Sequence, residues 1–347
     1  MPNRSLVWFR ADLRVNDNHA LHHACRASEG GVVGVFTICP EQWKEHDWAP
    51  VKVDFILRNL AELRDRLQTL NIPLKIIRAE RFRDVPEELL SLANSCSCDA
   101  LYFNREYELN ERARDCDVGE LFAGEGMGVH AFTDQVLIAP GQVRTQEGKW
   151  YTVFSPFKRS AVAYLEENPI EVLAKPSKQA AIDVESDDVP SSIEGFESEV
   201  DPELWKAGER AALARLRAFV EHRIDAYKDE RNFPAIDGTS KLSPYLAAGV
   251  LSPRQCVEAA ADASGGQLAS RKKSIEGPTH WISEVLWREF YKHLLVGFPR
   301  VSRNEPFKLD TKAINWSYSK KKFELWCEGR TGYPIVDAAM RALKTTG

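Results

Sequence analysis

No stretch of this 347-residue sequence approaches the roughly 20 consecutive apolar residues that a membrane-spanning helix needs. The first ten residues contain too short an apolar run for a secretory signal peptide, so we expect no membrane association. The low hydrophobicity that predicts disorder is missing as well, because 44% of the residues are hydrophobic and 28% are charged. Since the length exceeds that of most single cores, the sequence predicts a folded protein of two domains.

Cysteine is scarce, and its spacing fits neither of its common structural uses. The seven cysteines are odd in number and scattered, unlike a disulfide framework. Cys96 and Cys98 are separated by one residue, but no second Cys or His pair accompanies them, so we expect no metal site. We therefore expect a reducing, cytoplasmic environment.

Two phosphate-binding motifs are absent, G-x-G-x-x-G and G-x-x-x-x-G-K-[ST]. Gly124, Gly126 and Gly128 follow a helical pattern instead of lying between a strand and a helix, so we interpret them as a turn. These absences argue against a nicotinamide dehydrogenase and against a P-loop enzyme.

The first part of the sequence alternates short β-rich runs with helical patterns. Such alternation predicts an α/β fold, a parallel sheet covered by helices on both faces. Ligands of such sheets bind at the carboxyl ends of the strands, here near Arg10, Cys39 and Asn104. The expected strands are residues 6–9, 32–38, 74–77 and 101–103, and the expected helices lie near 18–28, 51–70, 85–95 and 108–122.

A connector rich in Pro, Ser, Asp and Glu runs from residue 169 to 202 and predicts a long exposed linker. Helical periodicity returns after it, and no alternating strand follows. We therefore expect an α/β domain at residues 1–135, an interdomain connector at 136–205 and an all-α domain at 206–347.

The net charge of −5 is divided unevenly along the chain. Residues 1–164 hold 20 basic and 23 acidic side chains, residues 165–205 hold 2 and 12, and residues 206–347 hold 24 and 16. The last part, at +8, permits a phosphate-binding face on the helical domain. Lysines and arginines also simply solvate helices, so the charge alone leaves both interpretations open.

One helical segment, residues 281–291, places aromatic and charged side chains together. At 100° per residue, five of them fall within about 120° of one face. Such a face suits a pocket, because aromatic planes stack on a flat ring while a carboxylate and a guanidinium bond to its polar edge. The alternative is a core aromatic stripe beside an exposed ion pair of Glu284 with Arg288. The five residues are Trp281, Glu284, Trp287, Arg288 and Tyr291.

A loop with three hydroxyls and a lysine precedes this segment: Thr239, Ser240, Lys241 and Ser243. Ser243 followed by Pro244 is typical of a helix N-cap. A helix start with these groups could bind a pyrophosphate. An ordinary capped helix is the alternative.

Five ordered segments carry a resemblance to a known family. They are Val7-Trp8-Phe9-Arg10 with Asp12-Leu13-Arg14 and Asp17-Asn18, Tyr107-Glu108-Leu109-Asn110-Glu111-Arg112-Ala113-Arg114-Asp115, the loop 238–243, Trp287-Arg288-Glu289-Phe290-Tyr291, and Gly332-Tyr333-Pro334-Ile335-Val336-Asp337-Ala338-Ala339-Met340-Arg341. From Leu6 to the end, the sequence resembles the photolyase and cryptochrome flavoproteins, most closely the folate-antenna group of cyclobutane pyrimidine dimer photolyases. The resemblance implies a doubly wound, Rossmann-like N-terminal domain followed by an all-α FAD-binding domain.

The resemblance also implies a U-shaped FAD, with the hydroxyl loop at its phosphates. The residues that match its contacts are Tyr227, Thr239, Ser240, Lys241, Leu242, Ser243 and Trp281, together with Glu284, Arg288 and Tyr291 on the helix.

UV-damaged DNA is the implied partner. Arg231 matches a DNA contact, and Arg288 is placed beside it as a backbone or flavin-side anchor. Glu284 matches the carboxyl that bonds to the pyrimidine edge of the dimer and stabilises its radical anion. Trp287 matches an aromatic wall beside the flipped-out lesion. The resemblance further implies a monomer with no obligate protein partner.

A second cofactor, 5,10-methenyltetrahydrofolate, is implied as a light-harvesting antenna. Ser302 and Arg303 stand where the best-known bacterial pattern has Cys and Lys, so the antenna is less defined than the flavin. The residues that match its contacts are His46, Asn110, Glu111, Ser302 and Arg303.

The implied mechanism is light-driven electron transfer. The antenna passes excitation to reduced FAD, an electron enters the dimer, the cyclobutane bonds split, and the electron returns. Trp316 matches the outer member of a tryptophan chain that re-reduces the flavin, although a helix anchor beside neighbouring lysines is the alternative. Because the family continues beyond Gly347, we expect an incomplete helical domain with exposed apolar faces.

Two other functions stay open from the sequence. A cryptochrome-like receptor would bind flavin without repairing DNA, and a nucleotide-binding α/β module with an unrelated helical partner would bind no flavin. The residues also leave the choice between cyclobutane and (6-4) lesions open.

Overall fold

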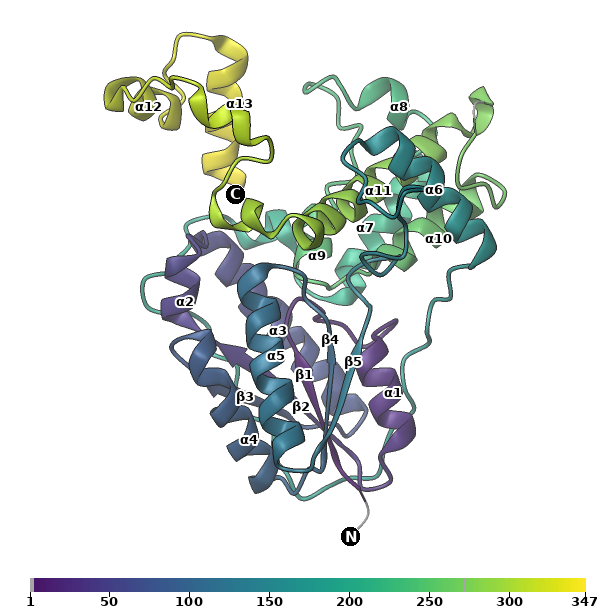
Figure 1. Ribbon diagram of the computed structural model, residues 1–347, viewed down its shortest axis with the longest axis vertical. Helices are drawn as coiled ribbons and strands as arrows, with labels where there is room; N and C mark the ends of the chain where they lie inside the picture. Colours follow the sequence, from purple (N-terminus) through teal and green to yellow (C-terminus); the bar gives the residue numbers. More distant parts are fainter. Residues whose placement is uncertain (1–2, 271) are drawn as a thin grey trace.

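A five-stranded parallel sheet forms the core of the first half (Figure 1). The computed structural model describes residues 3–270 and 272–347. The strand order is β3-β2-β1-β4-β5, so the chain starts at the centre and winds to each edge in turn, which confirms the predicted doubly wound sheet. The strands are β1 (Ser5–Phe9), β2 (Val32–Ile38), β3 (Leu74–Arg78), β4 (Ala100–Asn104) and β5 (Gly128–Phe132).

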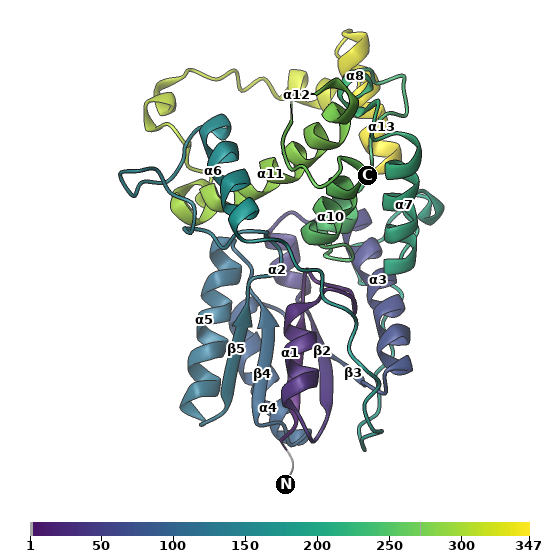
Figure 2. The ribbon, with the colours of Figure 1, turned by 90° about the vertical axis from the view of Figure 1, so that its right-hand side faces the viewer.

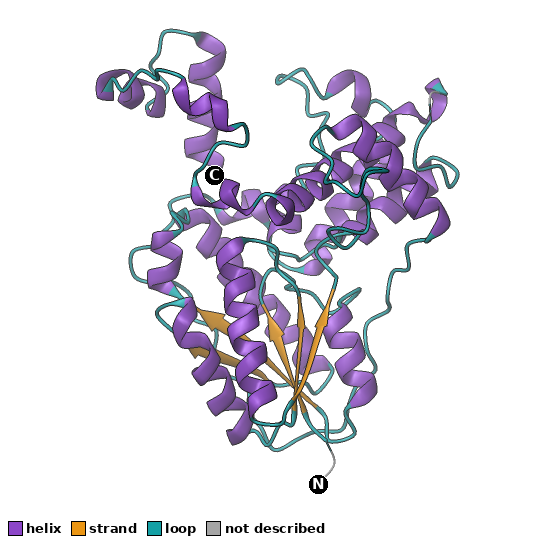
Figure 3. Ribbon diagram, in the orientation of Figure 1, coloured by secondary structure: helices purple, strands orange, loops and turns teal. Residues whose placement is uncertain are grey.

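Helices cover both faces of this sheet, which is why β1 and β2 are buried along their whole length (Figures 1 and 3). Right-handed crossovers place α1 and α3 on one face and α4 and α5, which pack against each other, on the other face. All four predicted strands and helices are present, within two residues of the expected bounds. The helices are α1 (His19–Ala27), α2 (Pro40–Glu45), α3 (Pro50–Thr69), α4 (Val85–Ser95) and α5 (Leu109–Gly124).

Strand β5 is the strand that the sequence prediction missed, and the short helix α2 was not predicted either. Gly128, which we assigned to a turn, pairs with Ala100 and begins this strand. Gly124 ends α5, and Gly126 makes the turn with a φ of +75°. The strand gives no continuous apolar signal because it lies at the sheet edge, where it is only half-buried and includes the polar His130.

After β5 the described chain is helical, as predicted for the second half. Helix α11 is central, since α6, α8 and α10 all pack against it (Figure 2). Short 3-10 turns lie at Phe82–Asp84, Pro202–Trp205, Lys273–Ile275, Pro299–Arg303 and Leu309–Ala313. The helices are α6 (Phe154–Glu167), α7 (Glu209–His222), α8 (Tyr227–Glu230), α9 (Ser243–Ala247), α10 (Pro253–Ala263), α11 (Glu276–Gly297), α12 (Lys320–Cys327) and α13 (Pro334–Thr346).

The acidic connector is bound to the α/β half instead of lying free in solvent. The backbone N–H of Asp187 donates to Leu74 O at 2.8 Å, and the Asp187 carboxylate accepts from Ile76 N at 2.9 Å. Phe196 is buried, with its ring edge-on to Trp43 at 6.2 Å. A composition poor in apolar residues is sufficient here, because hydrogen bonds to strand β3 replace a core of its own. The domain boundaries remain predictions.

A buried cluster of four charged residues joins the two halves. Asp134 lies between Arg14 of the first half and Arg254 of α10, at 2.6 Å and 2.7 Å. Arg254 also contacts the Asp17 carboxylate at 2.9 Å. Gly249 brings the backbones together at the same interface, since a Cβ on this residue would lie 1.9 Å from Ala11 O. The interface therefore fixes how the helical half sits on the sheet.

Glu289 of α11 makes a second buried connection. Its Oε2 accepts from Leu137 N at 2.9 Å and Ile138 N at 3.3 Å, while Oε1 has no partner within the described residues. Burial raises the pKa of Glu289 to about 7, above the 4.5 of a free carboxyl. Between these values the unfolded chain releases this proton while the folded chain keeps it. The folded state therefore loses stability as pH rises through this window.

We expect the free energy of unfolding to fall by up to about 3 kcal/mol from pH 4.5 to 8 through Glu289. Glu289→Gln, which mimics the neutral carboxyl, should remove this part of the fall. Urea unfolding at several pH values measures it, with the exposed Glu147→Gln as the control. Glu111, whose pKa is also raised to about 7, adds a fall of the same sign in both proteins. An identical pH dependence with and without Glu289 would contradict the prediction.

The last part of the chain, with α12 and α13, stands away from the main body of helices (Figure 1). The end of α13 is tied down where Trp205 Nε1 donates to Thr346 O at 2.6 Å. Large apolar side chains are exposed here, as expected from the sequence. No helix in the described residues has the length and apolarity that crossing a bilayer requires. The exposed side chains are Leu309, Ile314, Trp316, Tyr318, Phe323, Trp326, Tyr333, Ile335 and Leu343.

Candidate functional site

The predicted face of α11 is divided among three environments. Trp281 is buried, and its Nε1 donates to Ser240 Oγ of the hydroxyl loop at 3.3 Å. Glu284 and Trp287 are partly exposed in the middle of the helix. Arg288 points to the α/β half, where it donates to Gln135 O and lines a cavity. The Glu284 and Arg288 ion pair of the alternative interpretation is therefore not formed.

Glu284 is instead surrounded by basic groups from three elements. Arg231, at the end of α8, donates to its Oε1. His280 Nε2, one turn earlier on α11, lies 3.8 Å from the same oxygen. Lys158 of α6 is near enough that the charge of this carboxylate favours the protonated form of the lysine. The Glu284 side chain is 30% exposed, so a ligand arriving from solvent can reach it.

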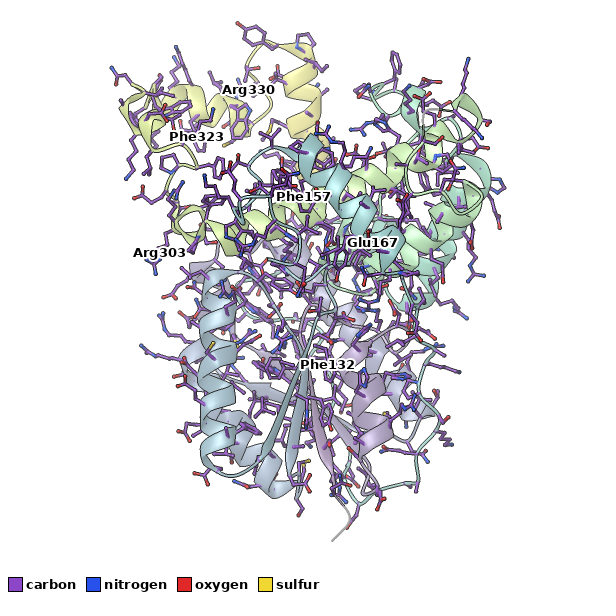
Figure 4. All side chains as sticks on the ribbon, turned by 45° about the vertical axis from the view of Figure 1, so that its right-hand side comes forward. Phe132, Phe157, Glu167, Arg303, Phe323 and Arg330 are labelled. Atoms are coloured by element: carbon purple, nitrogen blue, oxygen red, sulfur yellow. The ribbon has the colours of Figure 1, made fainter. Side chains whose placement is uncertain are left out.

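Trp287 stacks on Phe154, with ring centroids 3.7 Å apart and planes 12° from parallel. Tyr291, which is 57% exposed, follows one turn later at 5.6 Å and 25°. Sequence reasoning missed Phe154, because it begins α6 and is more than 130 residues away. Phe157, one turn along α6 and labelled in Figure 4, packs against Phe290 with ring centroids 5.3 Å apart and so fixes α6 on α11. An aromatic platform therefore lies beside the acidic group.

The hydroxyl loop lies next to a cavity of about 340 Å³ that Ser240 and Lys241 line. Lys241 has a φ of +51° in the left-handed region, an uncommon backbone conformation for a non-glycine residue. Asp237 neutralises Lys241 and Arg223, both at 2.7 Å. Hydroxyls and paired cations are the donor set that a pyrophosphate needs, so this loop fits the phosphate end of FAD.

The remaining residues of the predicted flavin set surround the loop. Tyr227 and Leu242 are buried, and Thr239 is partly exposed. Helix α9 begins at Ser243, so the predicted N-cap is wrong by one residue. Leu242 is the N-cap, and no side chain caps the helix. The chain reaches the helix through a tight left-handed turn at Lys241, which leaves the Ser243 hydroxyl exposed.

A larger cavity, of about 790 Å³, lies between the two halves. Four of the five predicted antenna residues line it: His46, Asn110, Glu111 and Ser302. Arg303 is not among the lining residues, and Figure 4 shows it at the outer edge of the molecule. The sequence analysis missed several further lining residues, namely Trp43, Trp48, Lys52, Phe82, Glu106 and Lys292.

Burial shifts the pKa values of two charged groups that line this cavity. Burial and the neighbouring Glu106 raise the pKa of Glu111 to about 7. Burial also lowers the pKa of Lys52 to about 8, although its ammonium lies 3.3 Å from the Trp48 ring centre. Perturbed titratable groups in a cavity of this size indicate a ligand site. Flat aromatic walls with carboxylate and amide edges fit a pteridine ring, and the lysines fit an anionic tail.

Trp316 is 63% exposed, and no aromatic ring stacks on it among the described residues. The structure brings it together with none of the other predicted site residues. Its electron-relay role remains a prediction. Arg288 binds carbonyls at the interface between the halves, and this position gives no support to its predicted DNA contact.

The structure is that of a two-part protein that binds a nucleotide cofactor. It joins a doubly wound sheet to a helical half, and it has a cavity that fits phosphates and an aromatic platform beside an acid. Residues 5–177 match the family described as DNA photolyase, and residues 281–347 match the FAD binding domain of DNA photolyase. A deoxyribodipyrimidine photo-lyase of Vibrio cholerae is 39% identical over 350 residues, covering 99% of this chain and 72% of that protein. The chain belongs to the DNA photolyase family.

Two solved structures share the fold. A class III photolyase from Agrobacterium tumefaciens superposes with a TM-score of 0.84 at 29% identity, covering 100% of this chain and 70% of that chain. A cryptochrome from Synechocystis superposes with a TM-score of 0.78 at 25% identity, covering 100% and 72%. The fold therefore occurs both in a photolyase and in a cryptochrome, so the fold alone does not distinguish these two functions.

Proposed function

We propose that this protein repairs cyclobutane pyrimidine dimers in UV-damaged DNA by light-driven electron transfer. Membership of the photolyase family and the matched FAD-binding domain support this function. The observation that carries it is the pairing of the Glu284 carboxylate with the Trp287 platform on one helix. A flipped-out lesion needs both groups, an aromatic face for stacking and an acceptor for its polar edge.

The platform and the groups around it have separate roles in the proposed function. Trp287, held by Phe154, stacks against the extruded bases, which are cheaper to unstack because the dimer already weakens their pairing. Glu284 accepts a hydrogen bond from the pyrimidine edge, and Arg231 binds a DNA phosphate. When bound, FAD in its reduced form would supply the light-driven electron transfer that splits the dimer. Thr239, Ser240 and Lys241 would hold the phosphates of this cofactor.

The cavity between the halves is proposed to hold the antenna, 5,10-methenyltetrahydrofolate. Glu111 and Asn110 would bind the polar edge of the pteridine, and Trp48 would contact its face. Lys52 and Lys292 would bind the anionic tail. We also propose that the protein is a monomer and that it is cytoplasmic. Its seven free cysteines support the cytoplasmic location, through the reducing environment that they imply.

Light dependence tests the function. We expect dimer-containing DNA to be restored by the FAD-loaded protein under near-UV or blue light and not in darkness. Equal repair in darkness would overturn the proposal. Light-dependent flavin reduction without selective binding of the dimer would identify a cryptochrome-like receptor, and a colourless protein that takes up no FAD would identify an unrelated nucleotide-binding module. Repair of (6-4) lesions alone would overturn the lesion assignment.

Glu284→Ala tests the chemical step. We expect repair per absorbed photon to fall about 10-fold or more, because a hydrogen bond to a charged group contributes about 1.5 to 3 kcal/mol. Affinity for the lesion should fall less, since the stacking on Trp287 remains. Glu276→Ala is the matched control. Glu276 lies on the same helix as Glu284, and it pairs with Lys228 of α8 as Glu284 pairs with Arg231. A repair yield unchanged by Glu284→Ala would exclude its role in stabilising the radical anion.

A further inference from the structure

Only one of the two oxygens of Glu284 is engaged in this structure. Arg231 donates to Oε1, and the His280 ring lies 3.8 Å from that same oxygen. No described residue donates a hydrogen bond to Oε2. One oxygen is therefore fixed by basic groups, and the other is left to accept from a ligand.

Arg231 has two possible partners, the Glu284 carboxylate and a DNA phosphate, and cannot bind both of them equally well. Its side chain is 27% exposed, so a phosphate arriving from solvent can reach it, and its guanidinium carbon lies 5.4 Å from the Tyr227 ring centre. A phosphate competes with the carboxylate for this single cation, since both accept the same planar fork of N–H donors. When the phosphate binds it, the nearest remaining basic group to Oε1 is His280.

We propose that His280 replaces Arg231 as the partner of Glu284 Oε1 when damaged DNA binds, so that Oε2 remains directed at the lesion. This role of a positioning residue rests on the proposed function. His280 lies one turn before Glu284 on α11 and is 38% exposed, so its ring has room to move toward the carboxylate.

The exchange couples DNA binding to a proton. In the free protein, burial and the neighbouring Arg231 hold the pKa of His280 below its ordinary value. Moving Arg231 onto a phosphate removes a repulsive charge and leaves the carboxylate facing the ring, which raises this pKa. The bound state then takes up a proton, so affinity increases as pH falls from the bound-state pKa toward the free-state pKa. The groups that face His280 are Lys158 from α6, Tyr227, Lys228 and Arg231 from the α8 region, and Glu284 from α11.

Binding in the dark measures the exchange without any repair. We expect the dissociation constant of a dimer-containing oligonucleotide to fall about 3- to 10-fold between pH 8 and pH 5.5, since a shift of one pKa unit corresponds to at most about 10-fold. His280→Gln should remove this difference. His222→Gln is the control, because His222 also lies 3.8 Å from a carboxylate, that of Glu221 on α7, in a more exposed pair. The control should keep the pH dependence of the wild type.

A titration of the wild type provides a second readout. The NMR signal of the His280 ring should report a higher pKa with dimer-containing DNA than without it. In the free protein, Arg231→Gln should raise the pKa of His280. A His280 pKa that DNA leaves unchanged, or a pH dependence that survives His280→Gln, would overturn the exchange. Wild-type protein that does not distinguish dimer-containing from undamaged DNA at any pH would instead overturn the proposed function.

Discussion

Asp134→Ala is expected to cost about 3 to 5 kcal/mol of folding free energy, the loss typical of removing one member of a buried charge group. Asp134 is fully buried between Arg14 and Arg254. Although burial opposes its ionisation, these two guanidinium groups hold its pKa at about 2. Without this carboxylate, two buried cations from the two halves face each other, and Asp17 is the carboxylate that still pairs with one of them, Arg254, among the described residues. Because whole domains are stable by about 5 to 15 kcal/mol, this loss is large.

Urea unfolding of both proteins at pH 7 measures this loss. Asp188→Ala is the matched control, since Asp188 pairs with Arg64 at 3.2 Å on the surface and its side chain is fully exposed. Exposed pairs of this kind contribute about 1 kcal/mol or less. If Asp134→Ala cost no more than Asp188→Ala, the cluster would not be what holds the two halves together.

Trp287→Ala is expected to weaken binding of dimer-containing DNA by about 1 to 3 kcal/mol, roughly 5- to 150-fold, through lost base stacking. FAD content should stay unchanged, because Trp287 packs on Phe154 and Tyr291 and not on the hydroxyl loop. Equilibrium binding in the dark and flavin absorbance of the purified protein measure the two quantities.

Trp326→Ala is the control for Trp287→Ala, because Trp326 is a solvent-accessible tryptophan on another helix, α12, at 44% exposure. It should leave the affinity for damaged DNA unchanged. Loss of FAD with unchanged DNA affinity in Trp287→Ala would show that the division of roles along α11 is wrong.

Local patterns in the sequence predicted much of the fold. The apolar run at 32–38 is a fully buried strand, and the run at 74–77 is an edge strand whose Leu74 and Ile77 are buried. The edge strand β5 was missed, since an edge position requires no apolar run. The connector was predicted as exposed because its composition shows that it cannot form a core of its own. Composition does not reveal the hydrogen bonds that the connector makes to strand β3.

The candidate site was predicted in part. The period of α11 placed Glu284 and Trp287 on one face, and the resemblance to photolyases supplied their roles. Phe154 and Lys158 were missed because they belong to α6, and only the packing of α6 on α11 brings them to that face. His280 was missed although it lies on the same face of α11 at 100° per residue, so the periodicity could have found it. Arg288 was expected beside Glu284, but the carbonyl of Gln135 attracts it to the other half.

The two-part organisation, the parallel sheet and the face of α11 that holds an acid beside an aromatic ring can be read from the amino-acid order, because side-chain periodicity follows from backbone geometry alone. The partner of each charged group on that face depends on the folded chain. Arg231 reaches Glu284 across 53 residues, and Arg288 turns to the sheet. Ion pairing depends on distance and burial, and packing between distant segments sets both.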